Sequence, residues 1–201
     1  MNSKEATIYQ QMRDDIISGE LRPGEKITEA KMAKKYNVSR TPIREAIKQL
    51  ELEYFIKDSY IFIPDSEEFR KIFEMRILLE THALQKAGVV FLQEDIDELR
   101  SYTDIDIDGD ESFIIETNDK FHQKIMSATH NEFIMDTYEK MRSFIFLFSK
   151  TVINKRRPGL IEEHKEIVNA LENRNIDEAI FLLREHLEKD LTFSLHYLEL
   201  N

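Results

Sequence analysis

The sequence contains no cysteine and no tryptophan, and it has only 5 glycines and 4 prolines among its 201 residues. Without cysteine, the protein can form neither a disulfide framework nor a thiolate metal site, and it cannot use a cysteine nucleophile. Few helix-breaking residues, together with 41% hydrophobic and 33% charged residues, are typical of a helical, soluble chain that can bury a core. We therefore expect a mainly α-helical globular protein.

Long hydrophobic runs are also absent. The longest apolar cluster, FIFLF at 144–148, is far shorter than the roughly 20 residues that a membrane-spanning helix needs. The N-terminal stretch MNSKEATIYQQMRDD lacks the apolar core of a signal peptide. We expect a cytoplasmic protein that does not contact the membrane.

The chain is acidic, with 28 Lys+Arg against 39 Asp+Glu, but the negative charge is unevenly distributed. Residues 1–63 carry 11 Lys+Arg and 10 Asp+Glu, a net charge of +1, whereas residues 64–201 carry 17 and 29, a net charge of -12. The N-terminal third is therefore the part that can approach a polyanion.

Two short helices are predicted at the start of the chain. Apolar side chains at helical spacing predict a helix over 6–18 that ends at Gly19, and Pro23-Gly24 predicts a tight turn. Thr28 is expected to cap a second helix that runs to about Tyr36.

The segment NVSRTPIREAIKQLE at 37–51 predicts a third helix with Ser39 as its N-cap. On a wheel of about 100° per residue, its apolar side chains share one arc, while Arg40, Thr41, Arg44 and Lys48 share another. Two short helices joined by a turn, the second presenting cations at its N-terminal end, describe a helix-turn-helix. FIKD and YIFIP then predict two short strands around Asp58-Ser59, which form a wing.

The stretch that contains LRPGEKITE and VSRTPIREAI resembles, over about residues 6–57, the DNA-binding domain of the GntR family of bacterial transcription regulators. The resemblance implies that Arg40, Thr41 and Arg44 contact double-stranded operator DNA, with Ser39 and Arg13 as phosphate contacts. An arginine fork suits guanine O6 and N7, and hydroxyl groups suit phosphates. The family's wing is usually longer and carries a glycine at its tip, whereas KDSYIFI has none. Whether this wing reads the minor groove is left open.

Pro64-Asp65-Ser66 ends this unit, so we expect a winged helix-turn-helix domain over 1–64 and a second domain over 65–201. The second domain is predicted to be an antiparallel bundle of about six amphipathic helices joined by short links. Their expected ranges are 66–87, 93–103, 111–129, 131–154, 159–173 and 175–199. On the last of these, one predicted apolar stripe comprises Ile176, Ile180, Leu183, Leu187, Leu191 and Leu198.

Three of the six histidines, His122, His164 and His186, lie on or beside the apolar arcs of three different predicted helices. Neutral imidazole nitrogens bind borderline divalent cations such as zinc, and three of them leave positions open for other ligands. The spacing alone is equally compatible with buried, hydrogen-bonded core histidines, so both interpretations stand.

Residues 66–199 resemble the FadR-like C-terminal ligand-binding domain, known as FCD, through NDKFHQKIMSATHNEFI and EEHKEIVNALENRNIDEAIFLLREHL. The resemblance implies a divalent metal ion, zinc or nickel, with the ligands Asn118, His122, His164 and His186. Asn118 stands where the family commonly has Asp. Asp119 competes as fourth ligand, although it lies about 100° round the helix from Asn118. Arg76, in EMRILLE, either helps to hold an anionic effector or forms a salt bridge with Glu80.

These features predict a ligand-responsive, sequence-specific DNA-binding regulator, more specifically a repressor, and not an enzyme. We expect it to act as a homodimer on a two-fold operator and to bind a small-molecule effector, a carboxylate. Two alternatives are left open. One is a metal-dependent hydrolase in which the histidine site activates water, although only Asp119 is at hand as a general base. The other is a DNA-binding module whose bundle only dimerises.

Overall fold

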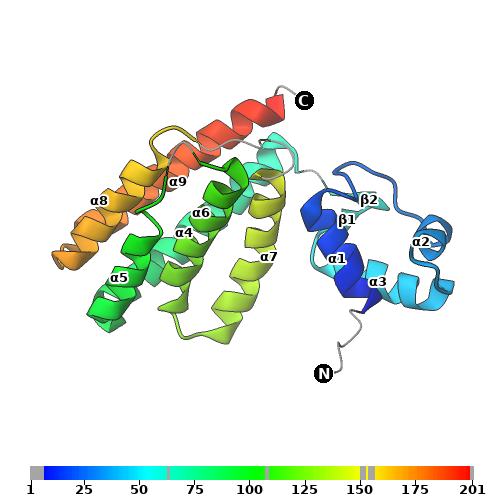
Figure 1. Cartoon of the computed structure of the whole chain (residues 1–201), viewed down its shortest axis with the longest axis horizontal. Coiled ribbons are helices and arrows are strands. Elements are labelled where there is room, and N and C mark those ends of the chain that lie inside the picture. The colour runs from blue at the N-terminus through cyan, green and yellow to red at the C-terminus, as the bar shows by residue number, and fades with distance from the viewer. Residues whose placement is uncertain (1–6, 63, 107–108, 150–152, 154–156, 200–201) are drawn as a thin grey trace. The chain divides into compact units, whose positions relative to one another are not determined.

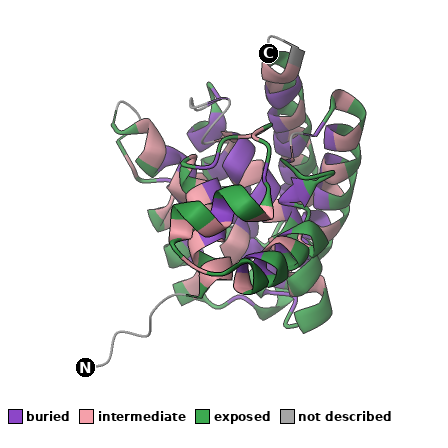
Figure 2. Ribbon diagram, turned by 90° about the vertical axis from the view of Figure 1, so that its right-hand side faces the viewer, coloured by how far each residue is buried: buried purple, intermediate pink, exposed green. Residues whose placement is uncertain are grey.

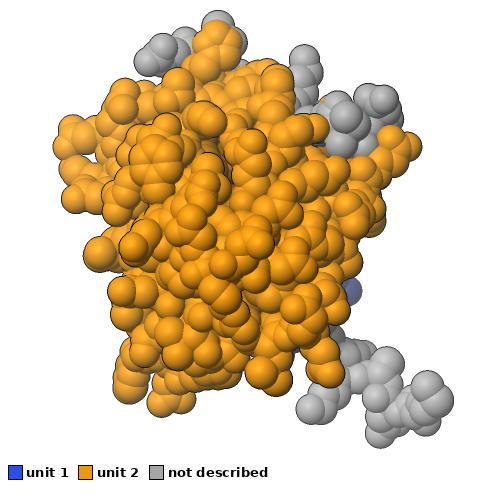
Figure 3. Space-filling model, turned by 90° about the vertical axis from the view of Figure 1, so that its left-hand side faces the viewer, with its two compact units in different colours: residues 1–63, 143–151 blue, residues 64–142, 152–201 orange. Residues whose placement is uncertain are grey.

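The computed structural model describes residues 7–62, 64–106, 109–149, 153 and 157–199. Within these ranges it contains nine α-helices and one two-stranded antiparallel sheet, which confirms the predicted mainly α fold class (Figure 1). The chain forms two compact units, one of residues 1–63 and 143–151, the other of residues 64–142 and 152–201 (Figure 3). The assignment of 143–151 to the first unit was not indicated by the sequence, and the predicted domain division stays a prediction.

Local capping signals set the three helices of the first unit. Helix α1 (Ile8–Ser18) begins after Thr7, whose side chain accepts a hydrogen bond from the Gln10 amide, and it ends at Gly19 with φ of 84°. Helix α2 (Glu29–Tyr36) begins after Thr28, which caps the Lys31 amide in the same way. Helix α3 (Arg40–Leu52) follows a turn of three residues. All three agree with the predicted ranges within two residues.

The wing is a hairpin of strands β1 (Ile56–Lys57) and β2 (Tyr60–Ile61). Its two turn residues, Asp58 and Ser59, have φ of 53° and 68°, the left-handed conformation that a tight two-residue hairpin turn requires. The segment 24–27 joins the hairpin, because the Ile27 amide donates to the Ser59 carbonyl at 2.8 Å. The predicted wing is therefore present and is built on a turn without glycine.

One hydrophobic core holds the first unit together. Each large aliphatic side chain that is fully buried there contributes about 1.5–3 kcal/mol relative to an exposed one. The core comprises Met12, Ile16, Leu21, Ile27, Met32, Ile43, Ala46, Leu50, Phe55, Ile56, Ile61 and Leu147. Leu147 lies far along the chain from the others, and its neighbour Phe144 has its ring centroid 5.7 Å from that of Phe55.

The second unit is a helical bundle. Its helices are α4 (Ser66–Val90), α5 (Gln93–Ser101), α6 (Glu111–Ser127), α7 (Glu132–Phe148), α8 (Leu160–Glu172) and α9 (Ile176–Glu199). Only the part of α7 up to Arg142 belongs to this unit, because the first unit includes residues from Ser143 on. Helix α9 packs along both α4 and α8, and α4 also packs on α6 (Figure 1). Helix α7 ends at Phe148, and most of its predicted continuation to residue 154 lies outside the described residues. No helix in the described ranges is both long and apolar enough to cross a membrane.

The buried face of α9 differs from the predicted apolar stripe. Leu183 and Leu187 are fully buried, but Ile176, Ile180, Leu191 and Leu198 are only half-buried. Polar residues take the intervening inward positions, among them His186, Asp190 and Ser194. Exposed residues lie on the outward faces of the helices (Figure 2). The interior of the bundle therefore contains a polar centre, and the side chains of α9 form one wall of it.

Candidate functional site

The first candidate site is the exposed N-terminal end of α3. Ser39, Arg40, Thr41 and Arg44 are all exposed, while Ile43 on the opposite face of the helix is fully buried. Ser39 occupies the N-cap position, but its side chain makes no capping hydrogen bond. The structure therefore brings together four of the five predicted DNA-contacting residues on one exposed surface.

Arg44 on this surface is paired with an acidic neighbour on α2. Its Nε donates to Glu29 Oε1 at 2.6 Å, and its Nη2 donates to Glu29 Oε2 at 2.9 Å. This two-bond geometry is also the one in which arginine binds the O6 and N7 atoms of guanine. The hydrogen bond from Arg44 lowers the pKa of Glu29, so Glu29 remains ionised near neutral pH.

The fifth predicted residue, Arg13, is engaged elsewhere in the first unit. Its Nη2 donates to Ser143 Oγ at 3.2 Å, its Nε lies 3.8 Å from a carboxylate oxygen of Glu53, and its guanidinium lies 5.5 Å from the centre of the Phe55 ring. The hydrogen bond to Ser143 uses one of the five N–H donors of Arg13. A phosphate contact by Arg13 stays a prediction.

The second candidate site lies at the polar centre of the bundle. His122 on α6, His164 on α8 and His186 on α9 are buried, with exposed fractions of 1%, 0% and 0%. The Nε2 atom of His186 lies 3.2 Å from that of His164 and 3.3 Å from that of His122. One nitrogen from each ring lies within 4.8 Å of the other two, as in a group that could hold a metal ion. The three histidines of the predicted ligand set therefore converge.

Carboxylates behind two of the rings orient them. His122 Nδ1 lies 2.6 Å from Glu80 Oε2, and His186 Nδ1 lies 2.9 Å from Glu163 Oε2. A ring whose Nδ1–H is donated to a carboxylate presents the lone pair of Nε2 on its other side, which is the arrangement found behind metal-binding histidines. In this tautomer, the Nε2 of His122 faces the centre as an acceptor. The Nδ1 of His186 also lies 3.1 Å from Arg157 Nη2, which can only donate, so Glu163 and Arg157 compete for opposite tautomers of that ring.

Two of the imidazoles, those of His122 and His164, are kept neutral by their surroundings. Burial lowers the pKa of His122, partly countered by the Glu80 carboxylate, and burial together with the other two histidines lowers the pKa of His164 well below its ordinary value. Since a metal ion binds the unprotonated nitrogen, these environments favour the ligand form near neutral pH.

Two buried polar atoms in this unit have no hydrogen-bond partner among the described residues: Asn118 Oδ1 and His164 Nδ1. An unpaired buried amide oxygen is costly unless something else binds it, and a cation is one such group. Asp119, the competing ligand, behaves differently, because its two oxygens accept hydrogen bonds from Arg142 on α7 at 2.8 Å and 2.7 Å. Asn118 Oδ1 is thus unpaired among the described residues, whereas both oxygens of Asp119 are paired, and a metal contact by either residue stays a prediction.

Two buried arginines surround the histidines. Arg76 on α4 donates to Glu80 at 2.7 Å and to Asp190 at 3.4 Å. Arg157 donates to Asp190 at 2.8 Å and also contacts Glu163. The salt bridge between Arg76 and Glu80, one of the two roles considered for Arg76, is therefore present. Its contact with an effector stays a prediction.

The charges of this network balance before any metal is added. Burial alone would raise the pKa of Glu80, but Arg76 and His122 lower it to about 2, so Glu80 is ionised. The three carboxylates Glu80, Glu163 and Asp190 face the cations Arg76, Arg157 and Lys189, whose Nζ lies 2.9 Å from Glu163. A divalent cation would therefore leave this centre with a charge of +2, which favours an anionic ligand.

Sequence reasoning missed part of this network. Glu163, Arg157 and Asp190 were not predicted as site residues, and Glu80 was considered only as a partner of Arg76. Weak signals were present, because Glu163 precedes His164 directly and Asp190 follows His186 by four residues, one helical turn.

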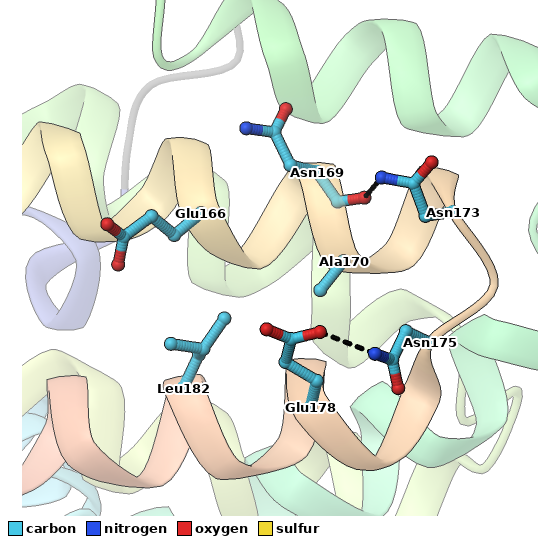
Figure 4. A pocket seen from close by; sticks show the side chains of 7 residues that line it. All are labelled: Glu166, Asn169, Ala170, Asn173, Asn175, Glu178 and Leu182. Atoms are coloured by element: carbon cyan, nitrogen blue, oxygen red, sulfur yellow. Dashed lines mark hydrogen bonds between the residues drawn. The ribbon is translucent and has the colours of Figure 1, made fainter.

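A separate surface groove of about 580 Å³ lies between α8 and α9 (Figure 4). It is lined by Glu166, Asn169, Ala170, Asn173, Asn175, Glu178 and Leu182. Hydrogen bonds within the group, from Asn173 to the Asn169 carbonyl and from Asn175 to Glu178, satisfy part of its polar lining. None of the converging histidines or arginines of the bundle centre lines it, so the groove does not belong to the candidate metal centre.

Comparison with known proteins adds an independent observation. The family model for bacterial regulatory proteins of the gntR family matches residues 4–57, and the model for the FCD domain matches residues 71–189. The HTH-type transcriptional regulator YdhC of Bacillus subtilis is 26% identical, with 95% of this chain and 91% of that protein covered. The Nta operon transcriptional regulator of Aminobacter aminovorans is 27% identical, with 86% of each covered. The structure of Escherichia coli McbR/YncC matches the fold with a TM-score of 0.73 at 17% identity, covering 100% of both chains.

Proposed function

The chain belongs to the GntR family of bacterial regulatory proteins, and from this premise we propose that it is a homodimeric repressor whose FCD bundle binds a divalent metal ion and a carboxylate effector. It is a DNA-binding transcriptional regulator with a helix-turn-helix and an effector-binding FCD domain. What the proposal adds is the metal, the class of effector, the dimer and the residues that carry each role.

Convergence of three imidazole nitrogens in the bundle is the observation that supports the metal most strongly. In the proposal, His122, His164 and His186 are ligands through Nε2, and Asn118 is the fourth ligand through its amide oxygen. Glu80 would hold the ring of His122 in the required tautomer, and Glu163 would do so for His186 in competition with Arg157. Zinc and nickel both suit this nitrogen-rich set. When bound, the ion supplies a Lewis-acidic centre that attracts an anionic oxygen.

The effector is proposed to be a small carboxylate because of the charge balance. A divalent ion added to a balanced network leaves two positive charges in a buried place, and an anion offsets them. Arg76 is proposed to orient that anion, since its guanidinium is buried and its bond to Asp190 is long. Binding of the effector would then change the DNA affinity of a dimer whose two heads contact a two-fold operator.

Regulation is proposed rather than hydrolysis. A hydrolase would need a carboxylate or imidazole free to take a proton from water. In the described ranges, the carboxylates that border this centre are each paired with an arginine, as Glu80, Glu163 and Asp190 are, and Asp119 is paired with Arg142. A screen of ester and amide substrates with the zinc-loaded protein tests this choice, and turnover that disappears in His164→Ala would contradict it.

Metal binding can be measured directly on the purified full chain. The metal content, the zinc and nickel affinities and the melting temperature with and without chelator are compared for the wild type, His164→Ala and His196→Ala. His196 is an exposed histidine of α9 and serves as the control. Because binding to the folded state stabilises it, we expect a chelator to lower the melting temperature of the wild type and of His196→Ala, but not of His164→Ala. A wild type that binds neither ion and ignores the chelator would reduce the three histidines to core residues.

The DNA surface is tested by selecting an operator from random DNA and measuring its affinity. Arg44→Ala should weaken the operator complex about ten- to a hundredfold if this residue reads a guanine edge. Arg22→Ala, an exposed arginine outside α3, is the control and should have little effect on affinity. Operator affinity should also fall steeply with salt, because phosphate contacts release counterions. Equal affinities for wild type and Arg44→Ala would remove Arg44 from the recognition surface.

A further inference from the structure

The proposed metal centre has an unusual feature in this chain, in that none of its proposed ligands carries a charge. The three imidazoles are neutral as ligands, and Asn118 offers a neutral amide oxygen. A divalent ion is held more tightly when at least one anionic oxygen contacts it, because the attraction between opposite charges is strong in a buried place. The structure places one candidate carboxylate on the correct side of the histidine rings.

That carboxylate belongs to Asp190, one helical turn after His186 on α9. Its Oδ2 lies 3.5 Å from His186 Nε2, which is the nitrogen that faces the other two histidines. The other two carboxylates of the network contact Nδ1 atoms instead, Glu80 behind His122 and Glu163 behind His186. They are therefore on the far sides of the rings, whereas Asp190 is on the side of the centre.

The distance from Asp190 to His186 is compatible with a shared ion. Two ligand atoms that each lie about 2.0–2.1 Å from one ion are about 3.0 Å apart at a right angle and about 3.4 Å apart at a tetrahedral angle. The separations between Nε2 atoms are 3.2 Å and 3.3 Å, and the distance from Asp190 Oδ2 to His186 Nε2 is 3.5 Å. The carboxylate is thus as far from His186 as one ligand of a common ion is from another. Among the described residues, however, the group of ligand atoms that all lie within 4.8 Å of one another contains the three histidines without Asp190, so sharing an ion requires Asp190 to move toward His122 and His164.

The two oxygens of Asp190 are held unequally. Oδ1 accepts a hydrogen bond from Arg157 Nε at 2.8 Å, whereas Oδ2 is 3.4 Å from Arg76 Nη1, a much weaker bond. The strong bond fixes the carboxylate at the edge of the centre, and the weakly held oxygen is the one nearest to the histidine nitrogen. Arg157 therefore positions Asp190 without occupying the oxygen that a cation would bind.

We propose that Asp190 is the anionic ligand of this metal centre, through Oδ2. This inference rests on the metal part of the proposed function and goes beyond its ligand set. The carboxylate that the family commonly places on the helix of Asn118 is, in this chain, replaced by one from α9. Asn118 and Asp190 together then supply the two oxygens beside the three imidazole nitrogens.

The test is a charge exchange between the two positions, measured as metal affinity on metal-free full-length protein. Zinc and nickel affinities are determined by competition with a chelator of known affinity. Asp190→Asn, which keeps the shape but removes the charge, should weaken zinc binding at least about tenfold. Asn118→Asp should tighten it, and the double variant Asn118→Asp/Asp190→Asn should return to within about threefold of the wild type.

Stability separates a ligand from a mere partner of the arginines. If Asp190 only neutralises Arg76 and Arg157, Asp190→Asn lowers the melting temperature of the metal-free protein but leaves the zinc and nickel affinities unchanged, and the proposal is overturned.

If Asp190→Asn fails to fold, Asp190→Asn/Arg76→Gln is used instead, because it removes one charge of each sign. The same loss of zinc affinity is expected of it. A wild type that binds neither ion overturns the metal part of the proposed function and this inference with it. A wild type that binds zinc as tightly as both Asp190 variants overturns this inference alone.

Discussion

Replacing Glu80 by glutamine should destabilise the bundle far more than the loss of an ordinary surface ion pair. Glu80 is fully buried and faces two partners, Arg76 Nε at 2.7 Å and His122 Nδ1 at 2.6 Å. The substitution keeps the size of the side chain but removes the charge, so Arg76 is left with only the weakly bound Asp190 as a compensating anion.

The magnitude follows from burial. At a separation of about 4 Å between charge centres and an effective dielectric constant of about 20, two unit charges attract by about 4 kcal/mol. Breaking one partner of a buried pair costs about 3–5 kcal/mol in proteins generally, which agrees with this value. Exposed pairs on helices contribute only about 0.3–0.5 kcal/mol. The control is Glu67→Gln, because Glu67 pairs with Lys71 on the same helix, and both of these side chains are exposed.

The measurement is urea unfolding at pH 7 in the presence of a chelator, followed by circular dichroism at 222 nm. The chelator removes any contribution from metal binding, and the helical signal is suitable because the chain contains no tryptophan. We expect Glu80→Gln to lower the free energy of unfolding by about 3 kcal/mol relative to Glu67→Gln, which corresponds to a fall of about 6–12 °C in the melting temperature. A difference below about 1 kcal/mol would refute the argument that this buried charge network stabilises the bundle.

Three further substitutions test other parts of the structure. Ser59→Gly should stabilise the first unit by up to about 1 kcal/mol, because glycine adopts the positive φ of this turn residue without strain. Urea unfolding measures this gain, and an unchanged unfolding midpoint would mean that the turn is not strained. Gly88→Ala should destabilise the second unit, since the added Cβ would clash with the side chain of Ile176. Overpacking of this kind costs about 1–3 kcal/mol, which is more than the gain in helix propensity. The double variant Gly88→Ala/Ile176→Val should recover part of the lost stability, and no recovery would locate the strain elsewhere. Asp119→Asn should leave zinc affinity within about twofold of the wild type, because Asp119 is paired with Arg142. Asn118→Ala should weaken zinc affinity at least about tenfold, because it removes the proposed ligand. A tenfold loss of zinc affinity in Asp119→Asn would make Asp119 the ligand.

The predictions that the structure confirmed most closely depend on short-range chemistry. Thr7 and Thr28 cap α1 and α2 through bonds to amides three residues ahead, and Gly19 and Asn37 end these helices in left-handed conformations. Each of these caps and helix ends depends on only a few neighbouring residues, so it can be predicted from the sequence. The inward direction of His122, His164 and His186 could be predicted for the same reason, because a helix of known range fixes the direction of each side chain.

The partners of those histidines could not be predicted, because they are separated widely in the chain. Glu80 lies 42 residues from His122, and Arg157 lies 33 residues from Asp190. The pairing of Asp119 with Arg142, 23 residues further along the chain on another helix, could likewise not be predicted. Helical periodicity states which way a residue points, but not which charged group from another helix meets it there.

The sequence by itself therefore determined the helices, their caps, the exposed cations of α3 and the three histidines that face inward. Only the tertiary structure decided how the charges of the bundle are distributed, which carboxylates lie behind the rings and which one lies on their open side. The physical reason is that hydrogen bonds within a helix join residues four apart, whereas a buried ion must be neutralised by whichever group the packing of other helices brings within about 4 Å. Asp190 shows this most clearly, since nothing in its local sequence distinguishes it from a solvated acidic residue until Arg76, Arg157 and His186 are seen around it.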